Sequence, residues 1–161
     1  MSGNVPQAWR DAAAGVASET LRWPVDNGHF GRGFGFVRRV RHEIPHLGVD
    51  VGAPAGSIIR AANDGIVIYS DDQVRGYGNI VILLHPDGAS TLYAHCRATY
   101  VFAGQQVVRG QSIAEVGATG LAQGNHLHFE WRVRGRARAP ERRFVHEPAI
   151  DVAQAPAVAS L

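Results

Sequence analysis

Cysteine is nearly absent from this chain of 161 residues, because Cys96 is the single one. No disulfide can therefore form within the chain, and cysteine usage does not reveal the redox compartment. Long hydrophobic runs are also absent, since no stretch approaches the roughly 20 apolar residues of a membrane-spanning helix. Residues 1–25 lack the basic start and the continuous apolar run of a secretory signal. The sequence therefore predicts no membrane insertion and carries no mark of export.

Lysine is missing altogether, so each of the 16 basic side chains is an arginine. The formal net charge of +2 is small, and it predicts only a mildly positive surface. Arginines crowd between residues 132 and 143. This segment predicts either a solvated loop or a contact with a polyanion.

Charge is sparse at 19% of the residues, while hydrophobic residues make up 45%, which excludes disorder over most of the length. The size predicts one domain that needs no disulfides. Residues 8–21 favour a short helix, which Pro24 prevents from continuing. From Phe34 onward, short runs of Val, Ile, Tyr and Phe are cut by Gly, Pro and Asp at intervals of about ten residues, as in all-β domains.

We therefore predict a mostly β protein, a single domain of antiparallel sheets with a short N-terminal helix and a loose C-terminal tail. The boundaries predicted are a lead-in segment at 1–22, the domain at 23–148 and a flexible tail at 149–161. Pro86, Asp87 and Gly88 predict a hairpin turn between two of the strands. The predicted strands are 35–41, 48–51, 58–61, 65–70, 79–85, 90–95, 112–116 and 126–133.

Two short motifs supply three imidazoles and a carboxylate, the side chains of a zinc hydrolase. His126 and His128 are two residues apart on a predicted strand, so they point to one face with Cα atoms roughly 6.6 Å apart. His46 and Asp50 are four apart, and on a straight strand they would be separated by roughly 13 Å, too far for one ion. A bend is therefore required, and Gly48 can provide it.

Together the motifs make the chain resemble the lysostaphin-type, or LytM-like, zinc endopeptidases, which cut peptides in bacterial peptidoglycan. The resemblance covers about residues 23–133 and rests on His-Leu-Gly-Val-Asp at 46–50 and His-Leu-His-Phe-Glu at 126–130. Further family-like segments are Ala-Pro-Ala-Gly at 53–56, Ala-Ala-Asn-Asp-Gly at 61–65, Gly-Tyr-Gly-Asn at 76–79, Tyr-Ala-His at 93–95, Gly-Ala-Thr-Gly at 117–120 and Gly-Asn-His at 124–126. This similarity implies the duplicated-hybrid-motif type of β fold.

The resemblance also implies the role of each site residue. His46, Asp50 and His128 would bind one zinc ion, whereas His95 and His126 would stay unligated and line the reacting bond. Three protein ligands leave a fourth position for a water, whose pKa falls to about 7 on zinc. The two unligated histidines would then share proton transfer and stabilisation of the tetrahedral intermediate. Which of them is the base stays open at this point.

Other polar residues near the motifs have two readings each. Tyr93 precedes His95 by two residues, so it either contacts substrate or packs in the core. Asn79 is a weaker candidate for substrate binding and is typical of a turn. Glu130 continues the face of the two motif histidines and is either a hydrogen-bond partner of an imidazole or a solvated carboxylate. The remaining histidines are interpreted as structural or surface residues: His29, His42, His85 and His146.

These observations predict a peptidoglycan endopeptidase. The alternatives are a non-catalytic activator module for other wall hydrolases and a zinc peptidase acting on peptides outside the wall. The predicted partners are peptidoglycan and, potentially, a regulatory protein, with no nucleic acid, and the chain is expected to be a monomer. Because peptidoglycan lies outside the cytoplasmic membrane, the substrate implies a periplasmic or secreted protein.

Overall fold

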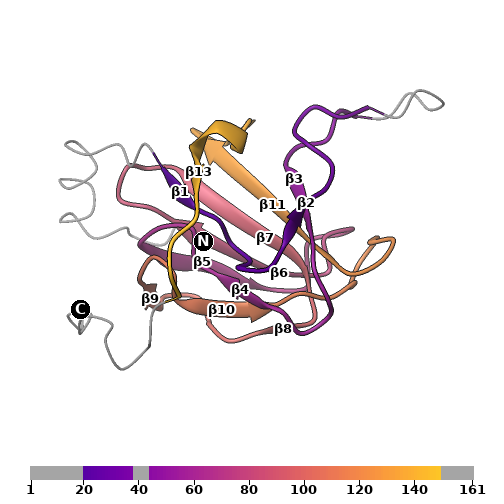
Figure 1. Ribbon diagram of the computed structural model, residues 1–161. Coiled ribbons are helices and arrows are strands. Elements are labelled where there is room, and N and C mark those ends of the chain that lie inside the picture. Colours follow the sequence, from indigo (N-terminus) through magenta and orange to yellow (C-terminus); the bar gives the residue numbers. More distant parts are fainter. Residues whose placement is uncertain (1–19, 38–43, 150–161) are drawn as a thin grey trace.

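The computed structural model describes residues 20–37 and 44–149, which form a mostly β structure (Figure 1). Its largest sheet has eight strands, and all neighbouring strands in it run antiparallel. β12 (Arg136–Arg138) pairs with β11 outside the main path. The path itself runs in the order β2 (His29–Phe30), β3 (Val49–Gly52), β11 (His126–Val133), β7 (Ser90–Cys96), β6 (Asn79–Leu84), β5 (Gly65–Asp71) and β9 (Gln106–Val107).

Two smaller sheets complete the described part of the chain. The three-stranded antiparallel sheet has the order β4 (Ile58–Arg60), β10 (Ser112–Glu115) and β8 (Ala98–Thr99). β1 (Leu21–Arg22) and β13 (Phe144–Val145) pair in parallel, and a 3-10 turn, η1 (Glu141–Arg143), precedes β13. Within the described residues, no helix has the length and hydropathy needed to cross a membrane. The predicted fold class, mostly β with antiparallel sheets, is confirmed.

The strongest sequence patterns gave the correct strands. β11 has the predicted bounds, and β6 and β7 form the predicted antiparallel hairpin around Gly88, whose φ is +83°. The strand predicted at 35–41 is wrong over 35–37, because Gly35 has φ +78° and lies in a turn. The rest of that segment, 38–41, lies outside the described residues, as do all but two residues of the helix predicted at 8–21. Its last residue, Leu21, belongs to β1.

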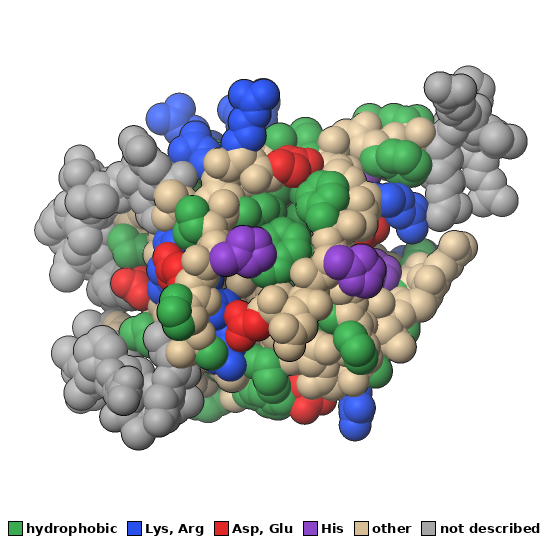
Figure 2. All heavy atoms as spheres, in the orientation of Figure 1, with side chains coloured by type: hydrophobic (Ala, Val, Ile, Leu, Met, Phe, Trp, Pro, Cys, Tyr) green, Lys and Arg blue, Asp and Glu red, His purple; other side chains and the backbone are tan. Residues whose placement is uncertain are grey.

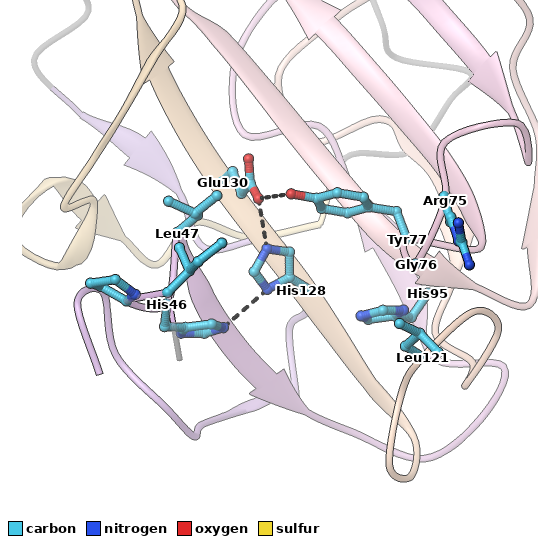
Figure 3. A pocket seen from close by; sticks show the side chains of 11 residues that line it. His46, Leu47, Arg75, Gly76, Tyr77, His95, Leu121, His128 and Glu130 are labelled. Atoms are coloured by element: carbon cyan, nitrogen blue, oxygen red, sulfur yellow. Dashed lines mark hydrogen bonds and ion pairs between the residues drawn. The ribbon is translucent and has the colours of Figure 1, made fainter. Parts of the chain in front are cut away.

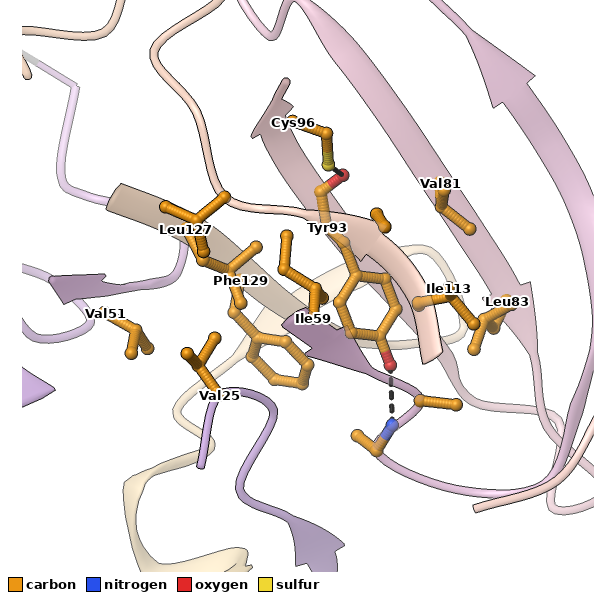
Figure 4. Close-up of a cluster of buried hydrophobic side chains, with 14 of the residues drawn as sticks. Val25, Val51, Ile59, Val81, Leu83, Tyr93, Cys96, Ile113, Leu127 and Phe129 are labelled. Carbon is orange, nitrogen blue, oxygen red and sulfur yellow. Dashed lines mark hydrogen bonds between the residues drawn. The ribbon is translucent and has the colours of Figure 1, made fainter. Parts of the chain in front are cut away.

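The core lies between the eight-stranded and the three-stranded sheets (Figure 4). Leu127 and Phe129 of β11 are fully buried against Ile59 of β4 and Ile113 of β10, each with 0% of its surface exposed. Burying one such side chain contributes about 1.5–3 kcal/mol to the free energy of folding. This packing fixes β11, and with it the polar residues that alternate with Leu127 and Phe129 on the other face.

Candidate metal centre and surrounding site

Three side chains from β3, β11 and the segment before β3 converge at one place in the large sheet. Asp50 of β3 lies directly opposite His128 of β11 in the strand register. The His128 Nδ1 atom is 3.2 Å from Asp50 Oδ1. The His46 Nε2 atom is 3.1 Å from Asp50 Oδ1 and 3.1 Å from His128 Nδ1. The three atoms therefore form a nearly equilateral triangle.

Gly48 makes this convergence possible, and the chain bends there as the sequence predicted. Its φ is not positive, so its backbone angles do not require glycine. A Cβ atom at Gly48 would instead lie 2.1 Å from the carbonyl oxygen of Phe129. The absence of a side chain thus lets the segment that carries His46 approach β11 closely.

Hydrogen bonds from outside the triangle decide which nitrogen of each imidazole carries the proton. His46 Nδ1 donates to the Gly33 carbonyl at 2.9 Å, which leaves a lone pair on Nε2. His128 Nε2 donates to Glu130 Oε1 at 2.9 Å, which leaves a lone pair on Nδ1. The third atom is a carboxylate oxygen of Asp50. Three hydrogen-bond acceptors therefore face one another.

Asp50 presents one of its two carboxylate oxygens to the triangle, and an arginine lies beside the other. Arg32 Nε lies 3.4 Å from the other carboxylate oxygen, Oδ2, so that Oδ1 stays in the triangle. Ligand atoms of a tetrahedral zinc site lie roughly 3.3 Å apart, given metal–ligand distances of about 2.0–2.1 Å. The donor set and its spacing thus fit zinc.

Glu130 anchors the side of His128 that faces away from the triangle. It is fully buried, and it accepts hydrogen bonds from His128, from the Tyr77 hydroxyl at 2.8 Å and from Arg132 Nη2 at 2.6 Å. Burial would raise the pKa of Glu130, but these partners outweigh it and lower the pKa. Burial and the Glu130 charge raise the pKa of Tyr77 to about 12, so this hydroxyl remains a donor. Of the two readings of Glu130, the structure supports the bond to an imidazole.

Tyr77 was not singled out from the sequence as a site residue. The only signal for it was the Gly-Tyr-Gly-Asn segment at 76–79. Tyr77 supports the site by a hydrogen bond from the loop between β5 and β6 to Glu130 on β11. The two residues are 53 positions apart in the sequence. Local sequence patterns do not encode a contact at that separation.

His95 lies at the side of the triangle, at the end of β7. Its φ of +62° is unusual for a residue other than glycine, and its backbone N–H donates to the Tyr77 carbonyl at 2.8 Å. Its Nδ1 donates to the Thr119 carbonyl at 2.7 Å, so Nε2 keeps a free lone pair. Burial, together with the nearby His126 and His128 rings, lowers the pKa of His95. His95 is therefore neutral at neutral pH.

The positive φ of His95 also overturns the prediction that Tyr93 contacts substrate. Strict alternation would place both side chains on one face, but the irregular backbone turns His95 toward the site while Tyr93 enters the core. Tyr93 is fully buried, and its hydroxyl accepts hydrogen bonds from the Ala62 N–H at 2.8 Å and the Thr91 hydroxyl at 2.9 Å. The alternative reading, a packed core tyrosine, is correct.

His126 completes the group on the face of β11 that also carries His128. Its ring centroid is 4.9 Å from that of His95, and its Nε2 atom is 3.6 Å from Asp50 Oδ1. Nδ1 pairs with the Gly124 carbonyl at 3.0 Å, so Nε2 is the atom presented to the site. The structure thus brings together all five side chains that the resemblance implied.

Three of these side chains, His46, His95 and His128, line a hollow of about 360 Å³ (Figure 3). Its walls are largely apolar, with Leu47 on one side of His128 and Leu121 beside His95 on the other. Among the described residues that line it, Arg75 is the only arginine. The described lining consists of Ile44, Pro45, His46, Leu47, Arg75, Gly76, Tyr77, His95, Leu121, His128 and Glu130.

Asn79 and the remaining histidines lie outside this lining. The Asn79 side-chain amide donates to the Cys96 carbonyl at 3.1 Å, which is a structural bond between β6 and β7. His85 is buried and bonded to Thr91 and to the Asp64 carbonyl. His29 and His146 are exposed elsewhere, whereas His42 lies outside the described residues.

Known proteins resemble this chain in sequence and in fold. The profile of Peptidase family M23 matches residues 44–140. The Salmonella typhimurium protein named murein hydrolase activator NlpD is 38% identical over 121 residues, which cover 75% of this chain but only 30% of that protein. Because the chain spans less than a third of this relative, the likeness concerns one part of a longer protein.

Solved structures give the same result. A zinc-containing peptidase from Vibrio cholerae superposes with a TM-score of 0.69 at 35% identity, covering 75% of this chain and 39% of that one. The catalytic domain of the antimicrobial peptidase lysostaphin from Staphylococcus simulans superposes with a TM-score of 0.66 at 28% identity, covering 72% of this chain and 91% of that domain. The chain belongs to peptidase family M23, the lysostaphin-type peptidases.

Proposed function

We propose that this protein is a zinc-dependent endopeptidase that hydrolyses peptide bonds in the stem or cross-bridge peptides of peptidoglycan. The observation that carries the proposal is the triangle of acceptor atoms from His46, Asp50 and His128, which lies beside His95 and His126 and next to an open hollow. A non-catalytic module has no need of five polar side chains held in this way. The membership in family M23 supports the same function.

In this proposal the ion is held by His46 Nε2, Asp50 Oδ1 and His128 Nδ1. Once bound there, zinc would supply Lewis acidity to a water and to the substrate carbonyl. The residues around it keep the ligand atoms in place, because Gly33 and Glu130 fix the tautomers of the two imidazoles. One carboxylate and two neutral imidazoles would leave the centre with a net positive charge, which favours a developing oxyanion.

We assign proton transfer to the two unligated histidines. Both rings bond a backbone carbonyl through Nδ1, so both keep a lone pair on Nε2. We assign the base to His95, because its ring lines the hollow together with His128. It would accept the proton of the attacking water and return it to the leaving amine. His126, with its ring 4.9 Å from that of His95, would assist in its protonated form, in which Nε2 also carries a proton and can donate to the oxyanion.

The walls of the hollow agree with a peptide substrate. Leu47 and Leu121 offer apolar surface to side chains beside the scissile bond, and Arg75 offers a guanidinium to a carboxylate. Peptidoglycan stem peptides carry both kinds of group. Since that substrate lies outside the cytoplasmic membrane, we propose a periplasmic or secreted location.

A second candidate is suggested by one relative. The Salmonella protein is named a murein hydrolase activator, so a role in switching on other wall hydrolases is the alternative. In that case the hollow would contact a partner protein rather than a peptide about to be cut. The two functions differ in whether the isolated, zinc-loaded protein releases fragments from a cell wall.

The decisive experiment incubates the zinc-loaded protein with purified sacculi of known cross-bridge chemistry and identifies the released fragments by mass spectrometry. His126→Ala is the matched control, because it removes an unligated histidine and leaves the three proposed ligands. New amino termini that are absent from the control are the expected result, and they name the bond that is cleaved. Zinc binding without release from any wall type would overturn the endopeptidase in favour of the activator.

A further inference from the structure

A β-hairpin extends β11 beyond the candidate metal centre. Arg134 and Gly135 form its two-residue turn, with φ values of +52° and +75°, the combination that a type I′ hairpin requires. In the register of the hairpin Trp131 faces Arg138, and Val133 faces Arg136. Directly opposed residues point to the same side of a sheet, so these four side chains share one face.

This face continues into η1 and forms a concave surface, here called the Trp131 surface. The guanidinium of Arg143 lies over the Trp131 ring, 5.2 Å from its centroid. The hollow measures about 640 Å³. Its lining consists of Trp131, Val133, Arg138, Ala139, Glu141, Arg142 and Arg143. Figure 2 shows basic side chains projecting at the edge where η1 and the end of β11 lie in Figure 1.

The Trp131 surface carries an excess of positive charge. Three arginines line it against one acid, Glu141, whose Oε1 atom already accepts a hydrogen bond from the Phe34 N–H at 2.7 Å. On the other face of the hairpin Arg132 is neutralised by the buried Glu130, at 2.6 Å. The two faces of one hairpin thus differ, because the excess charge is confined to the face that has a hollow and an aromatic ring.

We propose that the Trp131 surface is a second binding site, for an anionic glycan. Planar guanidinium groups match carboxylates with paired hydrogen bonds. Because the Arg143 guanidinium lies over the Trp131 ring, the other two arginines of the lining, Arg138 and Arg142, are the ones that would meet the ligand. Identifying the glycan as a peptidoglycan strand that has lost its stem peptides, and whose carboxylates are therefore free, rests on the proposed function. The charge and shape of the hollow do not depend on that function.

The position of the Trp131 surface suits a tether. Trp131 and His128 point to opposite faces of β11, because they are an odd number of residues apart. Val133 lies roughly 17 Å along the strand from His128. A glycan bound to the Trp131 surface would therefore leave the catalytic hollow open to a peptide.

The test measures binding rather than cleavage. Soluble glycan strands stripped of their stem peptides contain no scissile peptide, so the result does not depend on whether the protein is a peptidase. Their affinity for the full chain is measured by calorimetry, with neutral chitin oligosaccharides as the uncharged comparison and single-stranded DNA as another polyanion. We expect binding to the carboxylate-bearing strands, weakened by salt, and weaker binding to both comparison polymers.

The double variant Arg138→Gln with Arg142→Gln should weaken glycan binding about tenfold, since two exposed charge pairs are lost. Arg97→Gln is the matched control, because Arg97 is exposed and lies near Glu115 on a different sheet. Circular dichroism checks that both variants fold. Equal affinity of the double variant and the native chain would overturn the proposal. Equal binding to the neutral oligosaccharide, or tighter binding to DNA, would overturn it as well.

Discussion

The two faces of β11 differ in chemistry although both are buried at the centre of the strand. His128 and Glu130 alternate with Leu127 and Phe129, and none of the four is more than 8% exposed. The apolar pair contacts the core between the sheets, where the contacts are non-directional and depend on shape and volume. The polar pair has a specific partner for each nitrogen and oxygen. Burial alone therefore does not distinguish the core residues of this strand from its site residues, whereas their polar contacts do.

The two faces of β11 should therefore respond differently to substitution. A buried polar group costs free energy unless its partners are in place, so replacing a single polar atom on the polar face should already change metal binding. On the apolar face, a change in side-chain volume should change the free energy of unfolding. Variants on neighbouring residues of one strand should thus separate metal binding from stability.

The largest effect is expected on the polar face. His128→Ala removes the ligand atom that faces both His46 and Asp50, so zinc binding at stoichiometric concentration should be lost. Hydrolysis of sacculi should fall at least about a thousandfold. Metal content by atomic spectroscopy and fragment release measure the two quantities. Full zinc occupancy in this variant would contradict the assignment of the triangle.

On the apolar face, Phe129→Ala should give the reverse pattern. Removing this fully buried ring should lower the free energy of unfolding by about 3–5 kcal/mol, because a cavity is left between the sheets. The protein that remains folded at low temperature should still bind one zinc ion. Denaturant unfolding of the metal-free protein gives the first value and zinc titration the second, with Phe129→Leu as the milder comparison.

A smaller effect is expected for the carboxylate behind the metal centre. Glu130→Gln keeps the shape but loses the charge that orients His128, and zinc affinity should fall about 10–100-fold. Competition with a chelator of known affinity measures this change. Tyr77→Phe removes only one of the three donors to Glu130, so it should have a weaker effect in the same direction. A larger loss for Tyr77→Phe would mean that the tyrosine acts on the site by another route.

The smallest effect tests the assignment of Tyr93 to the core. Tyr93→Phe leaves the Ala62 N–H without its partner and should cost about 1–3 kcal/mol of unfolding free energy. Because the hydroxyl does not line the catalytic hollow, kcat/KM for a soluble peptide should stay unchanged. A drop in kcat/KM with unaltered stability would restore the substrate-binding reading.

Much of the fold followed from local patterns. The alternation at 126–133 predicted β11, and the turn residues at 86–88 predicted the hairpin of β6 and β7. The two-residue strands β1, β2, β8, β9 and β13 were not predicted, because so short a pairing has no period of its own. They exist where the packing of longer strands brings backbone segments together.

The sequence predicted which residues belong to the candidate site better than it predicted their geometry. Five residues came from motifs and a resemblance, and the structure places them together. The positive φ of His95 separated it from Tyr93, and no spacing rule signals such a backbone irregularity. Gly48 was correctly singled out as a bend, but what requires a glycine there is the close approach to Phe129, which lies 81 positions further along the sequence.

The sequence by itself determined the strand periodicity, the turn positions and the kinds of side chain available for metal chemistry, because each of these depends on residues within a few positions of one another. Tertiary structure alone decided that His46 Nε2, Asp50 Oδ1 and His128 Nδ1 meet within 3.2 Å and that Tyr77 and Arg132 satisfy Glu130. It also decided that the excess arginine charge gathers around Trp131. The physical reason is that distances between segments far apart in the chain are set by packing and sheet register, which no local pattern encodes.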